Sequence, residues 1–156
     1  MVEENRAVGF TRRSILIATL TGGAGSVSAA LASPPTDSVD AVKLIKQLTG
    51  RTATESDRIH LVMPRVFPNG YTVPLTLSID TAMTEADHVR HVQVLAPHNP
   101  LIVVATFHFV RQKSEPRIST RIRLAKPQDV VALAEMNDDA LLMTRTWVEV
   151  ATNGCA

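Results

Sequence analysis

Apolar and polar residues alternate with a period of two along several stretches of this chain. Successive side chains of a strand point to opposite faces, so such stretches are typical of half-buried strands. In 71–80 the apolar face holds Val73, Leu75, Leu77 and Ile79, and in 101–110 it holds Leu101, Val103, Ala105, Phe107 and Phe109. With shorter apolar runs, the pattern predicts seven strands: 59–63, 71–80, 89–95, 101–110, 117–124, 130–135 and 142–150.

Turn residues separate these strands, and no long helical pattern lies between them. The turn sequences include Pro68-Asn69-Gly70, Pro97-His98-Asn99-Pro100 and Asn137-Asp138-Asp139. Because parallel strands need long crossover connections, this arrangement favours an all-β fold, an antiparallel β-sandwich. Pro74 interrupts one strand and lacks an N–H, which indicates an edge strand or a bulge.

One helix is expected before the strands. Apolar residues recur at helical spacing in 38–48, at Val42, Leu44, Ile45 and Leu48, and Gly50 follows as a stop signal. The sandwich would therefore carry a short N-terminal helix.

Residues 1–32 have the layout of a twin-arginine export signal. Arg12 and Arg13 are adjacent and precede a moderately apolar, Gly-containing stretch that ends in Ala30-Leu31-Ala32. We expect cleavage after Ala30 or Ala32 and export to the periplasm. An uncleaved anchor or a cytoplasmic amphipathic tail is the alternative.

The expected organisation has four parts: the signal (1–32), a linker and helix (33–57), the β-sandwich (58–150) and a flexible C-terminal arm (151–156). After the signal, acidic and basic side chains are equal in number and dispersed. This balance favours neither nucleic acid nor an anionic membrane as a partner.

Cys155 is the single cysteine, in Asn153-Gly154-Cys155-Ala156. An unpaired cysteine in an exported protein indicates a reactive thiol or an intermolecular bond. Cys155 lies five positions after Val150, so an extended arm would carry the thiol about 17 Å from the sheet. Gly154 and Ala156 add little bulk beside the sulfur, which suits insertion into another protein.

The order of several runs resembles the SoxY family, the sulfur carriers of bacterial thiosulfate oxidation. These runs are Asn69-Gly70-Tyr71-Thr72-Val73-Pro74, Ile79-Asp80-Thr81-Ala82-Met83-Thr84, Asp87-His88-Val89, Ser119-Thr120-Arg121-Ile122-Arg123-Leu124-Ala125 and Val131-Ala132-Leu133-Ala134-Glu135-Met136. A closing strand then leads to a C-terminal cysteine. The resemblance covers nearly the whole chain and implies an immunoglobulin-like sandwich.

The resemblance also implies a role and partners. Cys155 would hold thiosulfate-derived intermediates covalently, and the carrier would be no enzyme and would need no cofactor. It would form a heterodimer with a SoxZ-like subunit, or homo-oligomers in its absence. The c-type cytochrome SoxAX, the thiosulfohydrolase SoxB and a sulfur dehydrogenase would act on it.

The arm departs from the family pattern, which ends Gly-Gly-Cys-Gly-Gly. Asn153 replaces a glycine, and Ala156 stands where the family has two glycines. Asn adopts left-handed backbone angles more readily than most residues, so it is a tolerable replacement. The three open outcomes are a working carrier with adapted partners, a paralogue with another sulfur substrate, and a carrier with impaired turnover.

Other side chains carry weaker signals. His88 and His91 would lie on opposite faces of a strand, which argues against a metal site. Arg117, Arg121 and Arg123 share one strand face, which is either solvated or directed at an acidic partner or anionic thiosulfate. His60, His98 and His108 are expected at the surface or in caps, and Trp147 is expected in the core or at an interface.

Two other functions stay open at this point. The chain could be an exported interaction module that uses Cys155 for an intermolecular disulfide, or a metal-binding periplasmic chaperone. Neither a phosphate-binding loop, a Ser-His-Asp arrangement nor a haem-binding Cys-x-x-Cys-His is present in the sequence.

Overall fold

The computed structural model describes residues 40–151. This part contains one helix, α1 (Ala41–Thr49), followed by strands only. The strands are β1 (Thr54–Glu55), β2 (Ile59–Val62), β3 (Val66–Phe67), β4 (Val73–Ile79), β5 (Val89–Leu95), β6 (Val103–His108), β7 (Arg117–Ile122), β8 (Gln128–Met136) and β9 (Leu141–Val150). All seven strands expected from the sequence are present. Among residues 40–151, no helix has the length and apolar character needed to cross a membrane.

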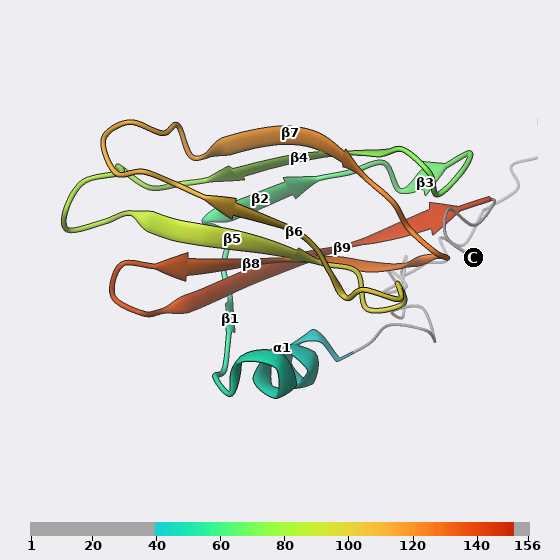
Figure 1. Cartoon of the computed structure of the whole chain (residues 1–156), viewed down its shortest axis with the longest axis horizontal. Helices are drawn as coiled ribbons and strands as arrows, with labels where there is room; N and C mark the ends of the chain where they lie inside the picture. Colours follow the sequence, from blue (N-terminus) through green and yellow to red (C-terminus); the bar gives the residue numbers. More distant parts are fainter. Residues whose placement is uncertain (1–39, 152–156) are drawn as a thin grey trace, which may run out of the picture. The chain divides into compact units, whose positions relative to one another are not determined.

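The strands form two layers (Figure 1). One sheet has the order β1-β9-β8-β5-β6, with β3 also paired to β9, and the other has the order β2-β4-β7. All pairings are antiparallel except those of β1 and β3, which run parallel to β9. The fold is an all-β, immunoglobulin-like sandwich, as the alternation and the resemblance indicated.

The main core lies between the two sheets. The four apolar residues expected on one face of β4 are buried there, while its other face is exposed or half-buried. β8 buries both faces: Val130, Ala132 and Ala134 join this core, whereas Val131 and Leu133 pack in a second cluster with Ile45 of α1. An amphipathic helix thus covers the outer face of a central strand.

Local signals define the ends of α1. The side chain of Asp40 accepts a hydrogen bond from the Lys43 N–H at 3.2 Å, which caps the first turn. Gly50 ends the helix with a φ of 71° and donates its N–H to the Lys46 carbonyl. The expected range of 38–48 therefore shifts to 41–49, and Gly50 is the stop signal that the sequence indicated.

Pro74 lies where β4 has a neighbour on one side only. β4 is the central strand of its sheet, so it is not an edge strand as a whole. However, β2 pairs with β4 only as far as the Val62–Thr76 pair, and Pro74 pairs with Arg121 of β7. The missing N–H therefore falls in a locally unpaired part of β4.

β6 departs from the alternation expected in 101–110. Its register against β5 shifts between Ala105 and Val103, so Val104 is an extra residue in β6. Val104 consequently packs against the main core, while Leu101 is 78% exposed and Val103 is 40% exposed. The prediction that Leu101 and Val103 share the buried face with Ala105 and Phe107 is wrong, because a bulge reverses the faces on either side of it.

Candidate functional site

The last described residues form the base of the C-terminal arm, and strands hold them on two sides. On one side β8 pairs with β9 as far as Val148, and on the other Phe67 of β3 pairs with Val150. Glu149 donates its N–H to the Arg65 carbonyl at 2.8 Å, and Ala151 donates its N–H to the Phe67 carbonyl at 3.1 Å. Val148 and Val150 are buried. The arm therefore starts from a well-anchored strand end.

The residues predicted for sulfur attachment, arm flexibility and export lie outside the described part of the chain. These are the attachment residue Cys155, its neighbours Asn153, Gly154 and Ala156, and the export residues Arg12 and Arg13. Their roles stay predictions. The structure contributes the position from which the arm leaves.

One short segment connects the base of the arm to the end of β7. The Phe67 carbonyl accepts from Ala151, and the Gly70 carbonyl accepts from Leu124 at 2.8 Å. Residues three apart along a chain are at most about 11 Å from one another. The arm base and the residues just after β7 therefore lie at the same end of the sandwich, as Figure 1 also shows.

A hydrogen-bond network fixes the loops at this end. Gln128 is fully buried; its side-chain oxygen accepts from the His98 N–H at 2.8 Å, and its amide nitrogen donates to Asn99 Oδ1 at 3.0 Å. Asn99 donates in turn to the Arg123 carbonyl at 2.8 Å and accepts from the Ala125 N–H at 2.8 Å. The Asn99 side chain thus links the loop before β6 and the segment after β7 to the Gln128 side chain at the start of β8.

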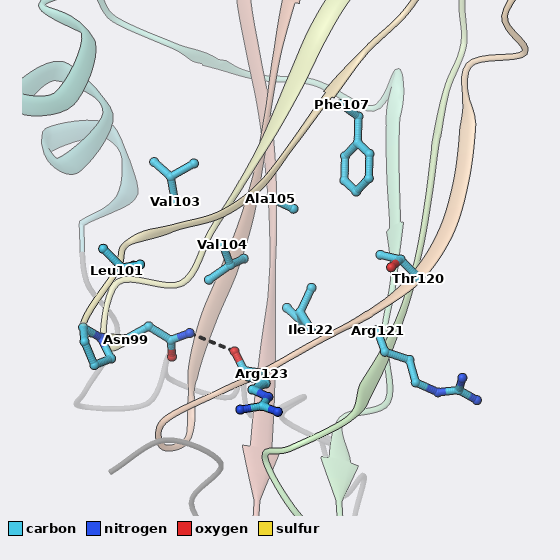
Figure 2. Close-up of a pocket in the computed structure, with 11 residues that line it drawn as sticks. Asn99, Leu101, Val103, Val104, Ala105, Phe107, Thr120, Arg121, Ile122 and Arg123 are labelled. Carbon is cyan, nitrogen blue, oxygen red and sulfur yellow. Dashed lines mark hydrogen bonds between the residues drawn. The ribbon is translucent and has the colours of Figure 1, made fainter.

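A cleft of about 600 Å³ opens between β6 and β7, which are the edge strands of the two sheets. Figure 2 shows Val104 and Ile122 lining it from opposite strands, with Phe107 farther along and Arg121 extending to the outside. Val104 and Phe107 pack against the main core but stay half-buried. The cleft is the open side of the sandwich, where no described strand covers the core.

Arg121 and Arg123 line this cleft, and together with Arg117 they form a basic strand face. Arg117, Arg121 and Arg123 are all exposed on β7 or just after it. Within residues 40–151, none of the three forms an ion pair with a carboxylate. Five arginines elsewhere do so: Arg51, Arg58, Arg90, Arg111 and Arg145. The basic strand face expected from the sequence is therefore present, and it lacks acidic partners within the described domain.

Asp129 is a buried carboxyl group near the same end. It is 7% exposed, and its Oδ2 has no hydrogen-bond partner among the described residues. Burial raises the pKa of Asp129, while the positive charges of Arg145 and His98 oppose the shift. Sequence reasoning missed this residue. The only sequence feature that could have indicated its burial is its position directly before the apolar run 130–134.

The histidines have ordinary partners. His88 and His91 do not converge: the His88 ring contacts the Thr84 carbonyl at 2.8 Å, and His91 lies 3.7 Å from Glu135. The His91 ring also contacts the His108 ring in a tilted arrangement, with centroids 5.6 Å apart. His60 contacts Asp80 at 2.8 Å. Within residues 40–151, no group of three or more His, Cys, Asp or Glu side chains is arranged to hold a metal ion.

Solved structures confirm the fold. The sulfur carrier protein SoxY from Chlorobium limicola f thiosulfatophilum has a TM-score of 0.57 and 24% identity, over 70% of this chain and 94% of that one. A variant of the superoxide reductase (neelaredoxin) from Ignicoccus hospitalis has a TM-score of 0.57 and 15% identity, over 65% and 97%. A putative superoxide reductase from Thermotoga maritima has a TM-score of 0.54 and 16% identity, over 63% and 93%.

Identities this low show a shared sandwich fold and nothing more. The search of curated protein sequences gave no match. The family comparison is more specific, because the model for "Sulfur oxidation protein SoxY" matches residues 45–155. That range begins in α1, includes every strand of the described part of the chain and reaches Cys155. The chain therefore belongs to the SoxY family of sulfur oxidation proteins.

Proposed function

We propose that this protein is a covalent sulfur carrier that holds thiosulfate-derived intermediates on Cys155 and presents them to partner enzymes. The observation that carries the proposal is the match to the SoxY family through residue 155. The anchored end of β9 supports the proposal, because a fixed base and a short arm limit the distance that the Cys155 thiol can extend from the sheet. From Val150 that reach is about 17 Å.

The proposed chemistry needs no catalytic group on the carrier. In the first step the outer sulfur of thiosulfate bonds to the Cys155 Sγ, the thiol proton leaves, and two electrons pass to a c-type cytochrome of the SoxAX kind. In the second step a SoxB-like thiosulfohydrolase adds water to the terminal sulfonate sulfur and breaks its bond to the sulfane sulfur. Sulfate departs, and a persulfide remains on Cys155. A sulfur dehydrogenase would then oxidise that sulfane sulfur to a sulfonate with oxygen from water, releasing protons and passing six electrons to a cytochrome acceptor, and a second hydrolysis would free sulfate and restore the thiol.

The proposal includes a place and a partner. The paired Arg12 and Arg13 support export by the twin-arginine pathway to the periplasm. We propose a heterodimer with a SoxZ-like subunit there, and self-association where that subunit is missing. The open edge between β6 and β7 is consistent with a need for a partner, because exposed strand edges are usually covered.

Mass spectrometry of the native protein tests the carrier role. Protein isolated from cells oxidising thiosulfate should show adducts on Cys155, either thiosulfonate or persulfide, and a reductant should remove them. A Cys155→Ser strain should lose thiosulfate oxidation. If only Cys155-linked dimers were found, and the Cys155→Ser strain oxidised thiosulfate normally, the protein would be a crosslinking module instead.

A further inference from the structure

We infer that the cleft between β6 and β7 binds an extended segment of a partner subunit, which adds a strand to β6 and carries apolar side chains and carboxylates. Three independent features of the cleft support this: its free backbone groups, its apolar lining and its unpaired positive charge. The inference names the binding surface for the partner subunit in the proposed function, and it rests on that proposal for the partner's identity.

The backbone of β6 has a free edge. Phe109 donates its N–H to the Arg90 carbonyl at 2.9 Å, and the Val92–Phe107 and Val94–Ala105 pairs continue this register. Alternate residues of an antiparallel strand direct their backbone groups to opposite sides. The backbone N–H and C=O groups of Thr106 and His108 therefore point away from β5. No described strand other than β5 pairs with β6. A segment aligned with β6 would satisfy these groups.

The lining of the cleft is apolar and incompletely covered. Val104, Phe107 and Ile122 face into it beside the main core. Leu101 also lines it and is 78% exposed, which is a large exposure for a leucine next to a cavity. Alternate side chains of an added strand point to the same face, so they would cover these residues.

The positive charge of the cleft selects an acidic partner. Arg121 and Arg123, which line the cleft, repel one another, and neither forms an ion pair with a described carboxylate. Carboxylates on the incoming segment would relieve this repulsion and orient the encounter. Arginine is well suited to such contacts, because its planar fork binds a carboxylate through two hydrogen bonds.

The same features argue against two other occupants. A second copy of this chain, docked symmetrically on this edge, would bring the two sets of β7 arginines together. Residues 152–156 of the arm, Thr-Asn-Gly-Cys-Ala, offer no large apolar side chain to fill a cavity of about 600 Å³. A different polypeptide, with carboxylates to meet the arginines and large apolar side chains to fill the cleft, meets both requirements.

Titration calorimetry with the SoxZ-type subunit of the same organism tests the inference. Thr106→Pro removes an outward N–H without breaking a bond to β5, and prolines are tolerated on strand edges. We expect it to weaken binding at least tenfold. Thr106→Ala keeps the N–H and is the matched control, for which we expect a change below threefold.

A second pair of variants tests the charge. Arg121→Glu with Arg123→Glu should weaken binding at least tenfold and reduce its dependence on salt concentration. Arg65→Glu with Lys113→Glu makes the same change in net charge at exposed positions outside the cleft, and it should change affinity less than threefold. Circular dichroism of each variant would show whether the fold is kept.

Several results would overturn the inference. The wild-type protein could fail to bind the SoxZ-type subunit, or Thr106→Pro and the double arginine variant could bind as tightly as their controls. Self-association that the cleft variants abolish would assign the cleft to a second copy. Protection of β6 amides that disappears on deleting residues 152–156 would assign it to the arm. Adducts on Cys155, measured separately, would decide the carrier role in each case.

Discussion

Ala151 donates its backbone N–H to the carbonyl of Phe67 at 3.1 Å, and this bond holds the residue from which the C-terminal arm departs. Phe67 belongs to the two-residue strand β3, and its half-buried ring packs against the main core. The packing of the Phe67 ring therefore contributes to holding the base of the arm, together with the pairing of β9 to β8.

Replacing Phe67 with alanine should loosen this base. Losing half of a phenylalanine's buried surface should lower the free energy of unfolding by about 1 to 2 kcal/mol. Hydrogen exchange followed by mass spectrometry should show faster exchange in a peptide that contains Ala151. Val66→Ala is the control, since Val66 is 68% exposed on the same strand. Equal exchange in both variants would mean that β3 does not depend on the Phe67 ring.

Gln128→Leu should destabilise the loops that line the cleft. The substitution leaves the half-buried His98 N–H without its acceptor, and it removes one of the two hydrogen bonds that Asn99 Oδ1 accepts. The expected loss is about 1 to 3 kcal/mol in the free energy of urea unfolding. Gln47→Leu, on an exposed position of α1, should change stability by less than about 0.5 kcal/mol. A loss no larger than that of the control would show that solvent replaces these bonds.

Asp129 should make stability fall as pH rises. Burial raises its pKa, so the folded protein binds the proton more tightly than the unfolded chain does. This contribution to stability is complete below the ordinary carboxyl value of 3.8 and is lost as pH rises through the raised pKa. Asp129→Asn should therefore be more stable than wild type at pH 7, by about 1 kcal/mol.

The measurement for Asp129 is urea unfolding at several pH values from 3 upward, compared between wild type and variant. Asp57→Asn, at an exposed position, is the matched control and should follow the wild-type curve. If Asp129→Asn and wild type kept a constant difference across that range, the carboxyl would not titrate with a raised pKa in the folded protein.

Gly50→Ala should destabilise α1 through its backbone alone. Gly50 has a φ of 71°, and an added Cβ would meet no atom within 4 Å. The cost of placing alanine in left-handed geometry is about 1 kcal/mol. Gly50→Asn should cost less, because asparagine tolerates this conformation better. Thermal unfolding of the two variants measures the difference, and equal losses would contradict the assignment to backbone strain.

Local patterns were sufficient for much of this fold. The alternation in 71–80 predicted the buried face of β4, because side-chain direction in a strand depends only on position along it. Gly50 marked the end of α1, since a helix stop requires a residue that tolerates positive φ. The same alternation of side-chain direction predicted that Arg117, Arg121 and Arg123 share one face of a strand.

Pairing between distant strands could not be predicted in the same way. β3 is a strand only because β9 lies beside it, and two residues carry no periodicity of their own. The bulge at Val104 depends on the register of β6 against β5, so the faces assigned to Leu101 and Val103 were wrong. Asp129 is buried by its surroundings, although its residue type favours the surface.

Order and spacing along the chain were enough for the fold class, the helix stop, the SoxY resemblance and the position of Cys155 after the closing strand. Three-dimensional packing was needed to establish that Phe67 anchors the arm base, that Asp129 is buried, and that the cleft lies between the edge strands β6 and β7. These features depend on contacts between residues far apart in sequence, and periodicity holds no information about such contacts.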